Sequence, residues 1–174
     1  MTIERMNIEY KRLLPENFSD GSRVWIYQAN RMFTLSEALD IEQMLEAFTE
    51  GWKSHGADVK GFATLFFGQF IILMADETAT GVSGCSTDSS VRLIRQIEDR
   101  FSVSLFDRQM LAFLRNEKIE LLPLGQFEYA VEGGFLNGET VYFNNTVLTK
   151  KALLEQWMIP LKESWLAQRM KVNQ

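Results

Sequence analysis

The residues best suited to chemistry gather in one segment of the chain, residues 74–92. This segment holds the acids Asp76 and Glu77, the single cysteine, Cys85, and a dense run of Ser and Thr hydroxyls. A strongly apolar run, Phe70 to Leu73, precedes it, and a helical pattern follows it. A strand-to-helix connection often holds ligands, because the free amides at the start of a helix attract anions. We therefore look for a functional site here first.

The start of this segment is similar to a Walker B strand, in which an apolar strand ends in acids that hold Mg²⁺. Gly56 and Gly61 have the spacing of the two P-loop glycines, but Phe62 and Ala63 stand where Lys and Ser/Thr are required. Without that lysine, nothing neutralises the terminal phosphates of a nucleotide. We favour a buried strand that ends in solvated acids.

A family resemblance covers most of the chain and rests on residues 65–70 (LFFGQF), 76–92, 106–109 (FDRQ) and 142–149 (YFNNTVLT). On these stretches the chain resembles an uncharacterised bacterial family without a P-loop, whose members are often labelled "ABC transporter ATPase". The resemblance implies no established activity. We do not expect true ABC-type ATPase activity, since the P-loop lysine is missing.

Cys85 lies three residues before Asp88, the expected N-cap of the following helix. A thiol near a helix N-terminus can have a lowered pKa and act as a nucleophile. The spacing Cys85-x6-Arg92 is one residue longer than the Cys-x5-Arg of cysteine phosphatases, which would rotate the arginine by about 100° on a helix. We favour a buried, inert thiol, with a reactive thiol as the alternative.

The same connection could bind an anion through backbone amides, because its glycines allow a nest of N–H donors. The candidate ligand-binding residues are Ser83, Gly84, Cys85, Ser86, Thr87, Asp88 and Arg92. Asp76, Glu77 and Asp88 together would suit Mg²⁺ if the loop folds back, but helix capping by Asp88 explains that acid without a partner. We expect neither a metal nor a cofactor.

His55 is the single histidine, and it could complete a Cys-His dyad with Cys85. We favour a surface position at the end of a helix, next to Gly56, because cations stabilise helix C-termini.

The composition is that of an ordinary globular protein, with 174 residues, 46% hydrophobic and 24% charged. We expect a single domain, residues 1–174. The net charge of −5 argues against a nucleic-acid surface. One cysteine excludes an internal disulfide, and no apolar run is long enough to span a membrane. A cytoplasmic location is expected.

Patterning predicts the following elements. Strands are expected at 23–29, 59–67, 70–75, 109–115, 118–122 and 140–143, with hairpin turns at Gly68-Gln69 and Asn116-Glu117. Helices are expected from a capping box at Thr34 to Trp52, from Asp88 to Phe101, and at 127–132. A last helix is expected from Thr149 through Met158; Pro160 breaks or restarts it, and Leu161 and Trp165 continue its apolar face. Residues 1–21 give a mixed pattern with turns. The apolar stripe of the last helix, including Trp157, Met158 and Trp165, is expected in the core, or in a homodimer surface if that helix is peripheral.

The order strand, helix, strand, strand, helix, strand over residues 23–115 matches a split β-α-β-β-α-β unit. We therefore predict an α+β fold: a mostly antiparallel sheet with helices on one face, built on a ferredoxin-like unit with C-terminal additions.

Three functions are weighed. The favoured one is a small binding or interaction domain with an anion-binding loop at residues 81–92, whose ligand would be a small anion. The alternative is an enzyme that acts on a small anionic substrate through Cys85 or the acids Asp76, Glu77 and Asp88. Such an enzyme would have an open pocket with Arg92 or His55 pointing in. Nucleotide hydrolysis is the least favoured.

Overall fold

The computed structural model describes residues 2–170, except for the side chains of Ile3, Glu4 and Cys85. The chain is α+β, as predicted, and forms two compact units. The first unit comprises the described parts of Met1–Leu14, Arg108–Val147 and Leu154–Gln174, and the second comprises Pro15–Asp107 and Leu148–Leu153. The prediction of a single domain stays a prediction.

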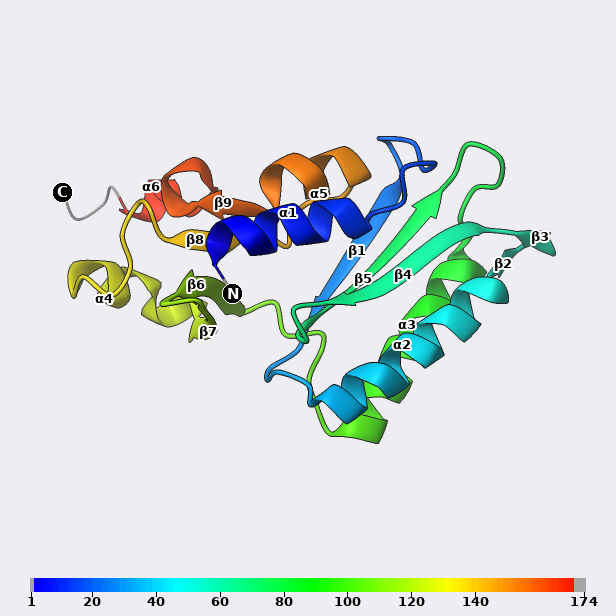
Figure 1. Cartoon of the computed structure of the whole chain (residues 1–174), viewed down its shortest axis with the longest axis horizontal. Helices are drawn as coiled ribbons and strands as arrows, with labels where there is room; N and C mark the ends of the chain where they lie inside the picture. The colour runs from blue at the N-terminus through cyan, green and yellow to red at the C-terminus, as the bar shows by residue number, and fades with distance from the viewer. Residues whose placement is uncertain (1, 171–174) are drawn as a thin grey trace. The chain divides into compact units, whose positions relative to one another are not determined.

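The second unit is built on a three-stranded antiparallel sheet of order β1-β5-β4 (Figure 1). Its strands are β1 (Arg23–Gln28), β4 (Lys60–Phe66) and β5 (Phe70–Asp76). All residues of β5 are buried. This confirms the central strand expected from an apolar run that does not alternate with polar residues.

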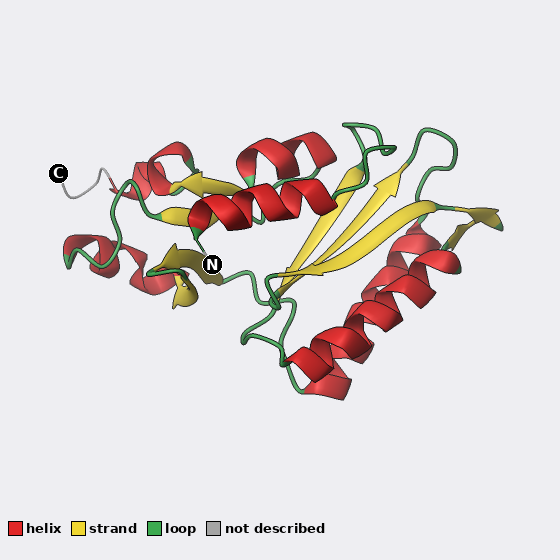
Figure 2. Ribbon diagram, viewed as in Figure 1, coloured by secondary structure: helices red, strands yellow, loops and turns green. Residues whose placement is uncertain are grey.

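Two helices, α2 (Leu35–Glu50) and α3 (Gly84–Phe101), lie on one face of this sheet (Figure 2). The predicted capping box starts α2, since the Thr34 hydroxyl accepts from the Glu37 amide and the Glu37 carboxylate accepts from the Thr34 amide. The core between the layers includes Ile41 and Leu45 of α2, Ile94 and Ile97 of α3, and Ile71 and Leu73 of β5. A small hairpin of β2 (Lys53–Ser54) and β3 (Ala57–Asp58) follows α2.

The ferredoxin-like detail is not confirmed. The strands β1 and β4 both run antiparallel to β5, which lies between them, and α2 connects them, so the first half of the predicted unit is present. The next strand, β6 (Met110–Arg115), pairs in a different sheet. The outer edge of β1 instead contacts Leu148 and Thr149: the Val24 amide donates to the Leu148 carbonyl at 3.0 Å.

The first unit contains a four-stranded antiparallel sheet of order β7-β6-β8-β9 and several short helices. The remaining elements are α1 (Ile3–Leu13), β7 (Lys118–Pro123), a 3₁₀ turn η1 (Leu124–Gln126), α4 (Phe127–Glu132), β8 (Val141–Phe143), β9 (Met158–Pro160), a 3₁₀ turn η2 (Leu161–Glu163) and α6 (Ala167–Met170). Its core includes the rings of Phe113, Phe127 and Tyr142. The helix α5 (Lys150–Gln156) contains residues of both units.

Two parts of the chain differ from the sequence prediction. The helix α1 was not predicted, although Met6, Tyr10 and Leu14 are spaced four apart and all are buried. The last predicted helix is right in its first part, since the Thr149 hydroxyl accepts from the Ala152 amide at 3.1 Å at the start of α5. Its second part was wrong, because 158–160 pair with β8 as a strand. Pro160 cannot donate to a helix, and the backbone groups around it are satisfied in the sheet instead.

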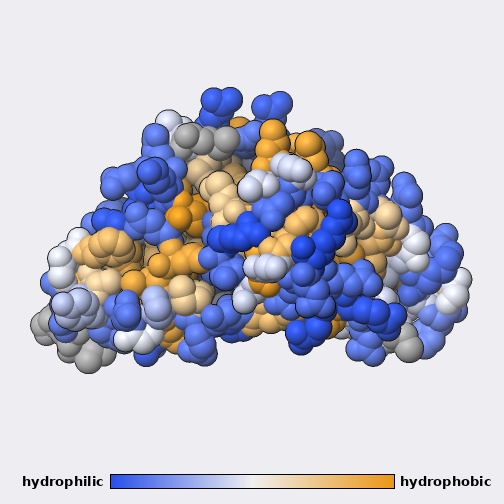
Figure 3. Space-filling view, turned by 90° about the horizontal axis from the view of Figure 1, so that it is seen from below, coloured by the Kyte–Doolittle hydropathy of each residue, from blue (hydrophilic) through white to orange (hydrophobic). Residues whose placement is uncertain are grey.

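The surface carries apolar patches among hydrophilic side chains, as one face shows in Figure 3. Large apolar side chains that remain exposed include Met32, Leu35, Leu39, Tyr129 and Leu148.

Candidate functional site

The connection from β5 to α3 begins at Asp76 and ends at Ser83, which is the N-cap of α3. The Ser83 hydroxyl accepts from the Ser86 amide at 3.2 Å, and the Ser86 hydroxyl donates to the Lys53 carbonyl at 2.7 Å. The prediction that Asp88 caps the helix was wrong. Ser83 is an equally good cap that comes earlier, so the helix starts earlier and Asp88 lies exposed within it.

Asp76 is a buried carboxylate, 3% exposed, that the surrounding chain saturates with donors. It accepts from the Ser19 amide at 2.9 Å, and from the Thr78 amide and hydroxyl at 3.0 and 2.7 Å. The Lys60 ammonium lies 3.6 Å away. These hydrogen bonds, that from Ser19 first, hold the pKa of Asp76 well below its usual range. This acid is therefore not the solvated strand end that was predicted.

The Glu77 side chain binds within the β5–α3 connection and to β1. Its carboxylate accepts from the Val82 amide at 2.9 Å and lies 3.4 Å from the Arg23 guanidinium. Among the residues that the structure describes, no group of three His, Cys, Asp or Glu side chains could hold a metal ion. The Mg²⁺ arrangement of Asp76, Glu77 and Asp88 is thus not formed.

A loop at residues 15–19, which sequence reasoning did not single out, is held by charged side chains from several elements. The Lys150 ammonium is buried and donates to the carbonyls of Pro15 and Phe18 at 2.8 and 2.9 Å. Lys60 donates to the Asn17 carbonyl, and Asp76 accepts from Ser19. Asp76, the acid of the Walker B-like strand, therefore has partners that give it a role in the fold.

His55 lies exposed at the tip of the β2–β3 hairpin, where its φ is 51° and that of Gly56 is 80°. The predicted surface position of His55 is confirmed. Its predicted place at the end of a helix was wrong, since α2 ends at Glu50 and His55 lies in the hairpin that follows. Cys85 belongs to the first turn of α3. Its side chain lies outside the described part of the structure, so its burial and a Cys-His dyad stay predictions.

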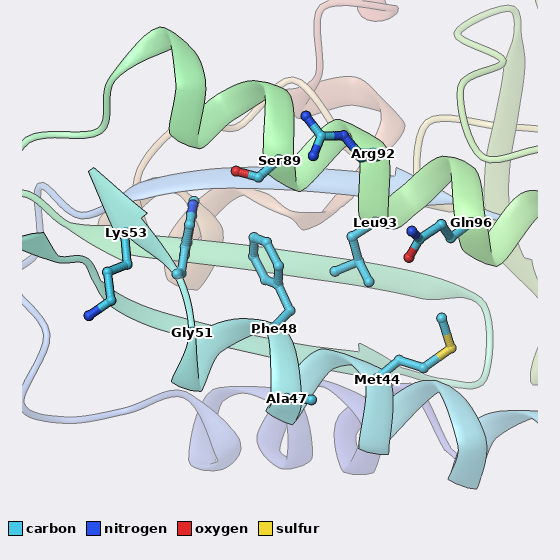
Figure 4. A pocket seen from close by; sticks show the side chains of 10 residues that line it. Met44, Ala47, Phe48, Gly51, Lys53, Ser89, Arg92, Leu93 and Gln96 are labelled. Atoms are coloured by element: carbon cyan, nitrogen blue, oxygen red, sulfur yellow. The ribbon is translucent and has the colours of Figure 1, made fainter. Parts of the chain in front are cut away.

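The predicted residue Arg92 lines a pocket of about 590 Å³ between α2 and α3. Figure 4 shows Phe48 of α2 and Leu93 of α3 pointing toward each other, with Arg92 beside Ser89 on α3. The described residues that line it are Met44, Ala47, Phe48, Gly51, Trp52, Lys53, Ser89, Arg92, Leu93 and Gln96. The other predicted ligand-binding residues whose side chains are described, Ser83, Gly84, Ser86, Thr87 and Asp88, do not line it.

Among the described residues, the charged side chains that line this pocket are positive. Its lining includes Arg92 and Lys53 and contains no acid, although the whole chain has a net charge of −5. Lys53 forms an ion pair with Asp58 across the hairpin. Within residues 2–170, no hydrogen bond or ion pair engages the Arg92 side chain, so its guanidinium is available to a ligand.

Trp52, which lines the pocket, is held by a hydrogen bond and by ring packing. Its indole Nε1 donates to the Ser86 carbonyl at 3.1 Å, and its ring lies 5.0 Å from that of Phe48. Gly61 packs directly under it, since a Cβ at that position would lie 2.6 Å from the Trp52 Cε3 atom. Sequence reasoning assigned Phe48 and Trp52 to a buried helix stripe, and only their four-residue spacing hinted at a shared role.

No known protein family, curated protein or solved structure matches this chain. None of the helices in the described part of the chain has the length and apolarity to cross a membrane.

Proposed function

We propose that this protein binds a small organic anion with an apolar or aromatic body in the pocket between α2 and α3. The observation that carries this proposal is the combination of an unengaged guanidinium, Arg92, with an aromatic and aliphatic lining that contains no acid. A site of this kind favours a ligand that has one charged end and one apolar end.

Each part of the lining has a role in such a complex. A guanidinium offers two parallel N–H donors that match a carboxylate or phosphate, which gives both charge and direction. The rings of Phe48 and Trp52 and the Leu93 side chain would cover the ligand's apolar body. Lys53 adds a second positive charge at the pocket, although its ion pair with Asp58 partly neutralises this charge.

This proposal places the anion near the middle of α3 rather than at its N-terminus. The Ser86 amide at the helix start is already engaged by the Ser83 side chain, so a ligand there would compete with the cap. We place this binding in the cytoplasm, in keeping with a single cysteine that leaves no internal disulfide.

The test is a titration with benzoate followed by the amide chemical shifts of α2 and α3. Benzoate should shift amides around Phe48 and Arg92, while neutral benzamide of the same shape should not. Arg92→Gln should weaken benzoate binding by about tenfold, because a charge-assisted hydrogen-bond pair is lost. Lys151→Gln is the matched control: it removes one positive charge at an exposed position that does not line the pocket.

Equal binding of benzoate and benzamide would contradict the role of the charge. Equal losses in Arg92→Gln and Lys151→Gln would show that only the net charge matters, and the assignment of Arg92 would then be wrong.

A further inference from the structure

The second unit has one sheet edge that no described strand covers. In the order β1-β5-β4, the outer side of β1 meets the backbone of Leu148 and Thr149. The outer side of β4 has no strand partner among the described residues. An uncovered edge presents backbone donors and acceptors to any extended segment that reaches it.

The register identifies which amides of β4 face outward. Leu65 is opposite Ile71, yet its amide donates to the Glu42 carboxylate at 2.9 Å instead of to β5. In an antiparallel pair, residues two apart present their backbone groups to the same side. Ala63 and Gly61 therefore face outward as well, and neither amide donates to another residue in the described part of the chain.

A groove of about 440 Å³ follows this edge between β4 and α2. Leu39, Glu42, Gln43, Glu46, Thr49, Gly61, Phe62 and Ala63 line it. Glu42 and Glu46 make the α2 side acidic, and none of the described lining residues is a Lys or Arg that would offset them. Glu46 is exposed and has no ion-pair partner within residues 2–170.

We propose that the β4 edge binds an extended peptide segment with basic side chains, which adds to the sheet as a fourth strand. The backbone groups of Gly61 and Ala63 would continue the hydrogen-bond ladder, and Glu42 and Glu46 would select the basic side chains. A second copy of this chain is a poor occupant, because pairing two β4 edges would bring four of these carboxylates together. This site is separate from the anion pocket, so each proposal can fail alone.

The test uses a blocked peptide of seven alternating lysines and valines, matched to the seven residues of β4. Binding should slow hydrogen exchange at the Gly61 and Ala63 amides, and an alternating glutamate and valine peptide should not bind. Glu46→Gln should weaken binding by about threefold, since one exposed ion pair is lost. Glu50→Gln, on the same helix but outside the groove, should have a smaller effect.

Two N-methylated isomers separate strand addition from charge attraction. One carries three methyl groups on valine amides and the other carries three on lysine amides, so each blocks one edge of the peptide. Strand addition requires the two isomers to differ in affinity by at least about tenfold, because a ladder of hydrogen bonds forms along one edge only. Equal affinities would overturn the proposal, as would protection of Gly61 and Ala63 by self-association without peptide.

Discussion

At the scale of single residues, Asp76 shows how a motif can mislead. An apolar strand followed by an acid pair is the pattern of a Walker B strand, but the Asp76 carboxylate already accepts three hydrogen bonds shorter than 3.1 Å from Ser19 and Thr78. A buried carboxylate with this many donors stabilises the fold and is poorly available to a metal ion.

Replacement of this acid should therefore cost stability. Asp76→Asn should lower the free energy of unfolding by about 2 to 3 kcal/mol, because charge-assisted hydrogen bonds are lost and an amide N–H₂ faces donors. Urea unfolding at pH 7 measures this. Asp88→Asn, at an exposed helix position, is the control and should change stability by less than about 0.5 kcal/mol. Similar losses in both variants would contradict the structural role.

The same carboxylate predicts a pH dependence. Folding lowers the pKa of Asp76, so the folded state binds fewer protons than the unfolded state at acid pH. Its stabilisation is complete above the unfolded pKa of about 3.9 and is lost as the pH falls through the lower folded pKa. The stability difference between wild type and Asp76→Asn should therefore shrink below about pH 4. A difference that stays constant down to pH 2 would contradict this.

At the scale of elements, the segments predicted from sequence are those whose signal is local. The β4–β5 and β6–β7 hairpins, the Thr34 capping box and the helix at 127–132 all formed as expected. Turn residues and caps act within a few positions of the chain. The start of α3 at Ser83 was missed, since several consecutive Ser, Thr and Asp residues could all serve as caps.

The candidate site could be predicted only in part. Arg92 was among the predicted residues, and the structure places it in a pocket. Its neighbours Phe48 and Lys53 come from other elements. The predicted β-α-β-β-α-β unit places both helices on one face of the sheet, but the sequence does not show which of their side chains line a common pocket. Lys150 was missed for the same reason, because its acceptors Pro15 and Phe18 lie more than a hundred residues away.

Because Gly61 of β4 packs against Trp52, we expect that adding one methyl group at Gly61 lowers the stability of the protein. Gly61→Ala would place a Cβ 2.6 Å from the Trp52 ring, so the ring or the strand must shift. We expect a loss of about 1 to 3 kcal/mol in the free energy of unfolding, as for other overpacked sites. Gly81→Ala is the matched control, since its Cβ would meet no atom within 4 Å. A neutral Gly61→Ala would show that Trp52 can move freely.

At the scale of the whole molecule, the two compact units are interleaved along the chain. The second unit takes residues 15–107 and then 148–153, while the first takes the segments on either side. Residues 148–153 supply the Leu148 carbonyl to β1 and the Lys150 ammonium to the loop at 15–18. The second unit therefore depends on a segment, residues 148–153, whose neighbours in the sequence on both sides belong to the first unit.

This interleaving predicts one unfolding transition for the whole chain. If the first unit unfolded alone, residues 148–153 would lose their flanking structure at both ends, and the entropy cost of keeping them on β1 and the loop would rise. In a urea titration, the native amide signals of Ile72 in β5 and Phe113 in β6 should disappear at the same midpoint and with the same slope. Lys150→Met should lower both midpoints together, because it removes the two hydrogen bonds that the Lys150 ammonium donates to the Pro15 and Phe18 carbonyls. Two separate midpoints, or a shift of the Ile72 signal alone, would show that the units fold independently and would contradict the single domain predicted from the sequence.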